Sequence, residues 1–241
     1  MAERISRLEK QFSNLHQSLL FELTEGEGVS VDIFDHALVM LPLAFRTEYQ
    51  DRVQAMRNTE PHGPGKVTTN IFLHYSPLFT FIDYRLLKHL ISELGSDKLK
   101  ERMDAYAVET EQFKKKTTVA EVMDIWPGNT KIRLDYTMVR TKFKGDPRMY
   151  TLEDLDNFRR RFCSELQLSN FIFWLISMEP VQSFFVIWCL PTTVVPEFIT
   201  NLHLIEEGFY IEENILSLTL ILYEGPLHVS LYNYNIMCYY F

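Results

Sequence analysis

The residue types that carry most protein chemistry are scattered along this sequence. Asp83 and His89 share a predicted helix, but six residues of separation point them to different sides of it. No serine or cysteine stands in the local signature of a nucleophile elbow. The remaining candidates also lack the spacing of metal ligands; they are His16, His36, His62, His74, His203, His228, Cys163, Cys189 and Cys238. We therefore predict no metal site, no cofactor and no catalytic residue.

Two glycine-containing segments come closest to phosphate-binding motifs. Lys66 follows Gly65 as in a phosphate loop, but Glu60 stands where the first glycine is required. Val67 stands where Ser or Thr would hold magnesium. The segment 26–28 lacks the third glycine and the preceding strand of a dinucleotide-binding fingerprint. We interpret both segments as turns.

Composition and charge narrow the class of protein. The 241 residues carry a net charge of −8, and 46% of them are hydrophobic, so a packed protein without the basic excess of a nucleic-acid binder is expected. The most apolar stretch, 171–190, is interrupted by Glu179 and Pro180, which predicts two strands rather than a membrane span. An odd number of separated cysteines, with a charged N-terminus and no apolar signal segment, predicts a cytoplasmic protein.

The first half of the chain is predicted to be helical. Apolar residues recur at alternating spacings of three and four from Ile5 to Leu19, which marks one side of a helix. Further helices are predicted over 30–41 and after Pro42, and the prolines and glycines of 60–65 predict a loop. These elements together predict an all-α bundle.

Two more helices and a capping box complete the predicted bundle. A strong helix begins after Pro77 and ends at Gly95. The next helix ends in the lysines 114–116, which we expect to be solvated and to complement the helix dipole. Thr118 and Glu121 form a predicted capping box for a short last helix.

From about residue 131 the pattern changes to strand, helix, strand, strand, helix, strand. The first strand is predicted to place Ile132, Leu134, Tyr136 and Met138 on its apolar face. Thr151 is predicted to cap the first helix. Residues 171–178 and 183–190 are almost continuously apolar, as in neighbouring strands covered on both faces. The last strand alternates, and its predicted inner residues are Leu216, Leu218, Leu220 and Leu222.

These patterns predict an α+β protein in which a helical bundle precedes a ferredoxin-like β-α-β-β-α-β domain. The predicted domains are residues 1–127 and 130–223, followed by an aromatic, uncharged tail at 224–241. We expect this tail to be dispensable, because Gly225 and Pro226 interrupt the strand; a fifth strand is the alternative. The predicted core of the second domain is Phe158, Phe162, Trp174, Trp188, Leu218 and Leu220.

The second half of the chain has a polarised charge distribution. All its Lys and Arg residues lie between Lys131 and Arg161, whereas acidic residues such as Glu212 and Glu213 follow. Arg159, Arg160 and Arg161 are consecutive in a predicted helix, so at least two of them should be solvated. We predict that these three arginines bind a partner, unless the acidic residues of the same domain lie close to them.

Four segments together resemble a region of many invertebrate animal proteins that stands beside death-fold or other signalling modules. The segments read FTFIDYRLLKHLI at 79–91, VMDIWPG at 122–128, YTLEDLDNFRRRFC at 150–163 and ILSLTL at 215–220. The resemblance covers most of residues 1–220 and implies a non-enzymatic part of a receptor or adaptor. It supplies no catalytic residues.

Three functional classes remain from the sequence. The favoured one is a protein-protein interaction module of intracellular signalling, with other proteins as partners. The second is an RNA-binding ferredoxin-like domain, but the strand 183–190 lacks the basic and glycine opening of an RNA-recognition motif, and nucleic acid is not the expected partner. The third is an enzyme whose catalytic groups converge from distant positions.

Overall fold

The computed structural model describes residues 1–25, 80–126, 128, 136–180, 183–222, 225–232 and 235–239. The predicted helices at 30–41 and after Pro42, and the predicted loop at 60–65, lie outside these residues. The chain divides into two compact units, Met1–Gln112, here the helical unit, and Phe113–Phe241, here the sheet unit. The division falls within a helix, and the predicted domain limits at 127 and 130 stay a prediction.

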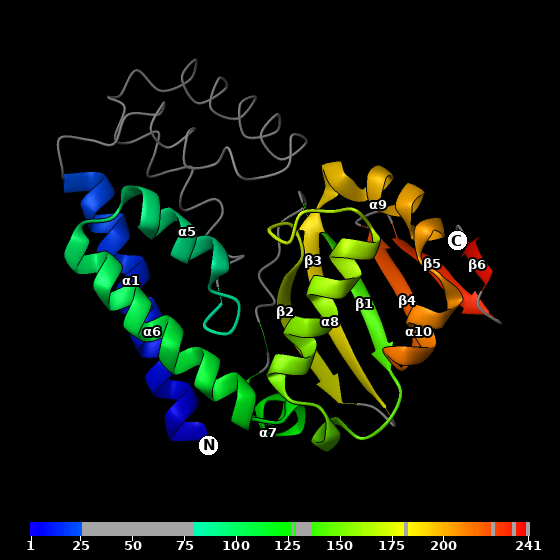
Figure 1. The fold of residues 1–241 in the computed structure, drawn as a ribbon, viewed down its shortest axis with the longest axis horizontal. Helices are drawn as coiled ribbons and strands as arrows, with labels where there is room; N and C mark the ends of the chain where they lie inside the picture. The colour runs from blue at the N-terminus through cyan, green and yellow to red at the C-terminus, as the bar shows by residue number, and fades with distance from the viewer. Residues whose placement is uncertain are drawn as a thin grey trace, which may run out of the picture. The chain divides into compact units, whose positions relative to one another are not determined.

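The helical unit contains α1 (Ala2–Glu25), α5 (Arg85–Leu94) and most of α6 (Asp97–Lys116), shown in Figure 1. The apolar stripe predicted for the first helix is confirmed and extends to Leu23. The buried residues of α1 are Ile5, Leu8, Phe12, Leu15, Leu19 and Leu23. A helix with one continuous apolar stripe gains its stability from packing that stripe against its neighbours.

The helix predicted after Pro77 begins only at Arg85. The side chain of Thr80 accepts a hydrogen bond of 2.9 Å from the backbone N–H of Asp83, and Arg85 donates two bonds of 2.7 Å to the Asp83 carboxylate. Such local side-chain bonds compete with helical ones, which accounts for the later start. Gly95 ends the helix as predicted. A Cβ at this position would lie 2.7 Å from the carbonyl oxygen of Ile91, so the site favours glycine.

The sheet unit combines antiparallel strands with helices, so the predicted mixture of helix and strand is confirmed. Its strands are β1 (Tyr136–Phe143), β2 (Trp174–Pro180), β3 (Phe184–Pro191), β4 (Ile215–Leu222), β5 (Gly225–Tyr232) and β6 (Asn235–Tyr239). Their order in the sheet is β2-β3-β1-β4-β5-β6, and every neighbouring pair is antiparallel. The central positions therefore belong to β1 and its neighbours β3 and β4.

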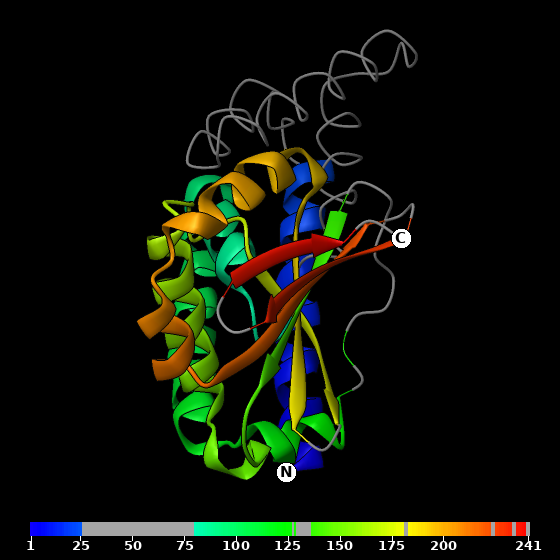
Figure 2. The same ribbon diagram turned by 90° about the vertical axis from the view of Figure 1, so that its right-hand side faces the viewer.

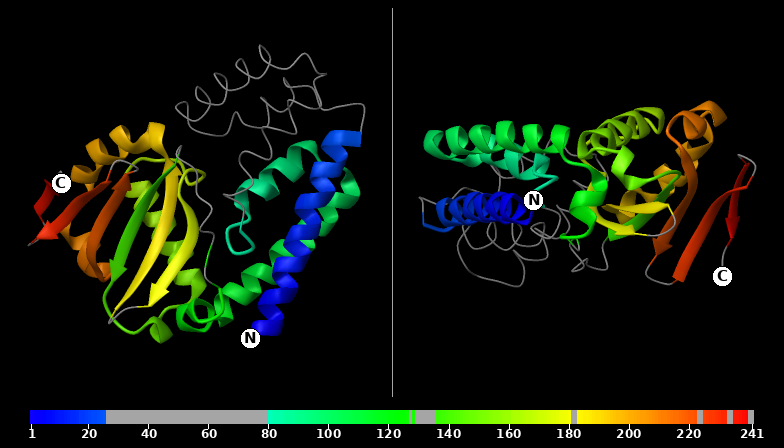
Figure 3. Two further views of the ribbon diagram at one scale, coloured as in Figure 1. Left: turned by 180° about the vertical axis from the view of Figure 1, so that it is seen from behind. Right: turned by 90° about the horizontal axis from the view of Figure 1, so that it is seen from below.

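Helices cover one face of this sheet. They are α8 (Leu152–Glu165), α9 (Val195–Asn201) and α10 (Glu207–Glu212), all in front of the strands in Figure 1 and behind them in the left view of Figure 3. The short helix α7 (Val119–Met123) precedes β1 in the chain, and the 3-10 turns Pro147–Met149, Thr192–Val194 and Leu202–Leu204 join the larger elements. Both predicted capping boxes, at Thr118 and Thr151, are confirmed.

The core of the sheet unit is rich in aromatic side chains. All six predicted core residues are buried, and Trp188 is 1% exposed between the rings of Phe158 and Phe173. The ring centroids lie 5.8 and 5.1 Å from that of Trp188, within the usual range for aromatic pairs. The alternate residues of β3 that include Phe184 and Trp188 thus point to the helices, and the opposite residues point away from them.

The prediction for the first strand holds only in part over the described residues: Tyr136 is buried, but the residues that face the helices are not the predicted set. Val139 and Phe143 are buried at the core, together with Thr137 and Thr141, whereas Met138 is only half-buried. The sequence placed Met138 inward because it continued the alternation of Ile132 and Leu134, which lie outside the described residues. The small threonines fit beneath the helices. In this strand they are therefore more deeply buried than the more hydrophobic Met138.

A β-bulge changes the predicted inner face of β4. Lys142 pairs with Ser217, but the next residue of β1, Phe143, pairs with Ile215, so Leu216 has no partner in the register. As a result Ile215 is buried and Leu216 is 42% exposed, contrary to the prediction for Leu216. An extra residue in one strand reverses the side to which the preceding residues point.

The tail predicted to lack regular structure forms a hairpin. β5 pairs with β4 through Leu220 and Leu227, and β6 pairs with β5, as Figure 2 shows. Gly225 and Pro226 therefore begin a strand instead of ending the sheet. The alternative fifth strand is the correct one, although the effect of deleting the tail stays a prediction.

The segment before β1 approaches β2 closely at Gly128. This residue has φ +80°, a conformation that glycine adopts without strain. A Cβ at position 128 would lie 2.4 Å from the carbonyl oxygen of Ile176. Ile176 is also where the register of β2 against β3 shifts, between Leu175 and Ser177.

Candidate interaction surface

The three arginines predicted to bind a partner have different environments on α8. Arg159 is 3% exposed and donates a hydrogen bond of 3.0 Å to the carbonyl oxygen of Asn170. Arg160 is exposed and donates to the Asn157 side chain at 2.6 Å. Arg161 is exposed as well, so the prediction that at least two are solvated is confirmed. Their role as a joint partner-binding site stays a prediction.

Arg161 faces part of the acidic set that follows it in the chain. It forms ion pairs with Glu212, at 2.9 Å, and with Glu213, and its guanidinium lies over the ring of Phe209. Burial raises the pKa of Glu213, and the nearby Arg161 opposes this shift. The charge polarity of the second half is thus at least partly neutralised within the sheet unit.

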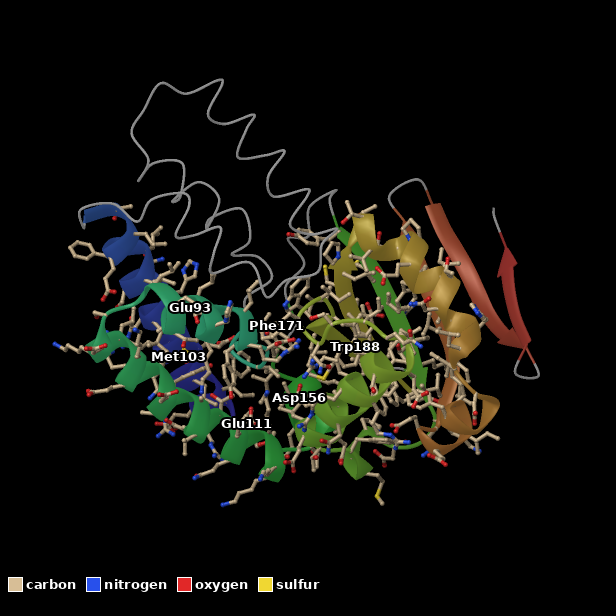
Figure 4. The ribbon with its side chains drawn as sticks, turned by 45° about the horizontal axis from the view of Figure 1, so that its top comes forward. Glu93, Met103, Glu111, Asp156, Phe171 and Trp188 are labelled. Atoms are coloured by element: carbon tan, nitrogen blue, oxygen red, sulfur yellow. The ribbon has the colours of Figure 1, made fainter. Side chains whose placement is uncertain are left out.

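Lys114 is buried, contrary to the prediction that all three lysines of 114–116 are solvated. Its side chain is 2% exposed, and its ammonium lies 2.6 Å from a carboxylate oxygen of Asp156. The second oxygen of Asp156 lies 3.6 Å from Nε of Arg159. Asp156, labelled on α8 in Figure 4, therefore serves two nearly buried cations and fixes the end of α6 to α8.

The face of the sheet opposite the helices carries an ordered array of side chains, half-buried around Phe185 and Lys142 but buried at Ser177, Ile187, Cys189 and Trp174. We call this array the open face, and the left view of Figure 3 looks onto it. The strand register arranges it in rows that run across β2, β3, β1 and β4. One row is Glu179, Phe185, Lys142 and Ser217, and the next is Ser177, Ile187, Arg140 and Thr219; the third contains Met138 and Ile221 together with the buried Cys189 and Trp174.

An aromatic ring and an ion pair occupy the centre of the open face. The guanidinium carbon of Arg140 lies 3.7 Å from the centroid of the Phe185 ring, and the same guanidinium pairs with Glu179. The side chains of Arg140 and Glu179 are 33% and 42% exposed, so solvent still reaches both. Nε of Arg140 is buried and has no hydrogen-bond partner among the described residues.

Lys142 adds a second cation to this centre. Its ammonium lies 5.7 Å from the same Phe185 centroid, and it forms no ion pair within the described part of the chain. The open face therefore holds two cations and one carboxylate, Glu179, beside apolar and hydroxyl side chains. Arg, Met and aromatic residues on one surface are typical of protein interfaces.

The helical unit has two hollows between α1 and α6. The larger, of about 510 Å³, is lined by Glu22, Ser96 and Arg102 among others, and the smaller, of about 270 Å³, lies by Tyr106 and Glu109. The charged side chains there bond across the helices: Glu22 accepts from Ser96 at 2.7 Å, and Arg102 donates to Ser18 at 3.2 Å. Gln11 and Arg7 donate to Glu109. These contacts hold α1 against α6, and they already engage the charged side chains named here.

The remaining reactive side chains do not converge. Burial raises the pKa of the Cys189 thiol, and Cys163 is buried as well, so neither thiol has the environment of a nucleophile. Burial lowers the pKa of His16 on α1. No group of three His, Cys, Asp or Glu residues with metal-site geometry occurs where the structure is described. Within the same residues, no helix has both the length and the apolar character to cross a bilayer.

Comparison of the chain with models of protein families, with curated proteins and with solved structures gave no match. The description of the site therefore depends on the geometry alone.

The sequence analysis missed the open face for a definable reason. The run from Ser183 to Leu190 is almost continuously apolar and was interpreted as covered on both faces; the burial of Ile187 and Cys189 agrees with this, but Phe185 is half-buried. The signal that could have indicated it is the pair Arg140 and Lys142, two cations at alternate positions of one strand. Alternation places both on one side of the sheet.

Proposed function

We propose that this chain is a non-enzymatic protein-interaction module and that its partner binds on the open face. The observation that carries the proposal is the centre formed by Arg140, Phe185 and Glu179 on the three strands β1, β3 and β2. It combines an aromatic ring with charged groups that remain partly exposed. Residues of these types dominate the binding energy of protein interfaces.

The proposal includes the finer class of the fold. A ferredoxin-like assignment of the sheet unit is supported by the order β2-β3-β1-β4, by antiparallel pairing throughout, and by α8 and α9–α10 between successive strands. In such a unit the helices cover one face and leave the other for binding. The hairpin β5–β6 is an addition to this arrangement.

We place the module in intracellular signalling, as a part of an adaptor or receptor. The support is the resemblance of four sequence segments to a region found beside death-fold modules. Two of these segments, 150–163 and 215–220, form α8 and the start of β4 in the sheet unit. Other modules of the same signalling protein, or proteins bound to it, are the expected partners.

RNA binding is the second candidate, and one observation favours it. Phe185 lies on a central strand with two cations beside it, as in sheets that stack RNA bases. Two observations weigh against it: Arg140 already stacks on the Phe185 ring, and the chain has a net charge of −8. Protein binding therefore explains the same surface better.

The test is to block the open face with a larger neutral side chain. Thr219→Tyr fills the half-buried position beside Arg140, and the matched control Thr200→Tyr makes the same change at an exposed position of α9. Wild type and both variants are used to capture proteins from nuclease-treated extract of the source cells, with quantification by mass spectrometry. Thermal unfolding establishes that all three are folded.

We expect a protein that is captured by wild type and by Thr200→Tyr and is lost with Thr219→Tyr. Equal capture of every protein by the two variants would contradict the proposal. A parallel capture from untreated extract is included, and a differential signal that appears only there would assign the face to RNA instead.

A further inference from the structure

The charges on the open face are not balanced within the described residues. Glu179 forms an ion pair with Arg140, whereas Lys142 forms no ion pair in that part of the chain. Lys142 is half-buried, and desolvation on binding makes an unpaired ammonium costly. A partner that covers Lys142 therefore has to bring an acceptor, and a carboxylate is the strongest one that proteins offer.

The surroundings of Lys142 define the rest of the partner. Its neighbours across the strands are Phe185 and Ser217, Ile187 lies in the adjoining row, and Ile221 lies in the row beyond that. Ile187 is only 7% exposed, whereas Phe185 and Ile221 are half-buried, so the accessible apolar surface near the charge belongs to Phe185 and Ile221. The single excess positive charge suits one or two carboxylates better than the continuous negative charge of a nucleic acid.

We propose that the open face recognises an extended peptide segment of another protein, with a Glu or Asp that pairs with Lys142 and apolar residues beside it. This inference rests on the proposed function and names the chemistry of its partner. An extended segment directs alternate side chains to the sheet, so the apolar residues should stand two positions from the acidic one. Arg140 remains held by Glu179 and Phe185 and forms the floor of the site.

The experiment is a selection of random eight-residue peptides, displayed on phage, against the full chain. Wild type, Lys142→Glu and the matched control Lys144→Glu are screened in parallel; Lys144 is exposed just after β1. Lys142→Gln, which removes the charge without reversing it, and thermal unfolding of each variant test whether folding is kept. The best peptide is then synthesised and titrated against all variants.

With wild type and Lys144→Glu we expect enrichment of Asp or Glu at one position, flanked at intervals of two by apolar residues. With Lys142→Glu the preferred residue should change to Lys or Arg. The acidic peptide should bind Lys142→Glu about tenfold more weakly than wild type, and Lys144→Glu about as well as wild type.

Three outcomes would overturn the inference. In the first, the enriched peptides bind wild type and not Thr219→Tyr, yet show no preference for Asp or Glu. This result would refute recognition of an acidic residue but would agree with the proposed function. If Lys142→Glu selects peptides with the same preference for Asp or Glu as wild type, the peptide does not bind at Lys142. No enriched peptide, together with unchanged protein capture by Thr219→Tyr, would remove both the inference and the proposed function.

Discussion

Asp156 is the residue on which two nearly buried cations depend. Its carboxylate lies 2.6 Å from the Lys114 ammonium and 3.6 Å from Nε of Arg159, whose side chains are 2% and 4% exposed. We predict that Asp156→Asn lowers the free energy of unfolding by about 3–5 kcal/mol, because it leaves two buried charges with less compensation. Lys114→Met should cost clearly less, since Asp156 is 18% exposed and keeps Arg159 nearby.

Denaturant unfolding of both variants measures this difference. An equal loss in Asp156→Asn and Lys114→Met would show that the contact acts only as a pair and that Arg159 takes no part.

Trp188, labelled in Figure 4, lies on β3 and packs against the rings of Phe158 and Phe173 in the aromatic core of the sheet unit. Trp188→Ala should lower the free energy of unfolding by about 3–5 kcal/mol, because it leaves a cavity between Phe158 and Phe173. Trp188→Phe should cost less, since the indole N–H is buried without a hydrogen-bond partner among the described residues. A Trp188→Ala protein that unfolds at the wild-type denaturant concentration would refute this placement.

At the residue scale, the sequence predicted the large apolar core residues and failed for the charged ones. Phe158 and Trp188 have few alternatives to burial, because exposure of an aromatic side chain is costly. Lys114 and Arg159 carry charges that favour solvent, and the carboxylate of Asp156, which lies on a different helix from Lys114, helps to compensate both charges. Lys114 and Asp156 are 42 positions apart in the chain, and no pattern in the sequence predicts their contact.

The bulge in β4 gives a prediction at the scale of one element. Ile215→Ala should lower the free energy of unfolding by about 2–4 kcal/mol, because Ile215 is 6% exposed. Leu216→Ala, the adjacent and matched change, should stay within about 0.5 kcal/mol of wild type, since Leu216 is 42% exposed. Urea unfolding of the two variants decides the register. A larger loss of stability in Leu216→Ala than in Ile215→Ala would support the regular alternation that the sequence indicates.

Helices were predicted better than strands for a physical reason. A helical stripe such as Ile5 to Leu23 repeats over many turns, so one deviation leaves its direction intact. A strand has a period of two, and a single extra residue such as Leu216 reverses every side chain on one side of it. In β1 the cause is different: the buried positions Thr137 and Thr141 are polar, so the pattern of hydrophobicity does not mark the inner face.

At the scale of the whole chain, the hairpin β5–β6 changes the expected effect of truncation. If the tail is dispensable, as the sequence predicts, deletion of 225–241 leaves the thermal midpoint unchanged. Because β5 pairs with β4 through Leu220, Ile221 and Leu222, we now predict a decrease of several degrees and a greater tendency to aggregate, as the edge of β4 becomes free. Differential scanning calorimetry of the truncated protein measures this, and an unchanged midpoint would favour the original expectation.

The candidate site could not be derived from the sequence, because it exists only after four strands have paired. Arg140, Phe185 and Glu179 are far apart in the chain and become neighbours through the order β2-β3-β1. The sequence did predict a sheet with helices and few reactive groups. A sheet of this kind can leave one face uncovered by helices. The sequence could not indicate which strand face the helices leave open.

The most direct test of the account is photo-crosslinking from the open face. A photoreactive phenylalanine analogue is placed at Thr219 in one protein and at Thr200, on the helix-covered side, in another. After irradiation in extract of the source cells, we predict a discrete protein adduct from position 219 and none of the same mass from position 200. Identical adducts from both positions, or crosslinks from position 219 to RNA alone, would contradict the claim that the open face binds a protein.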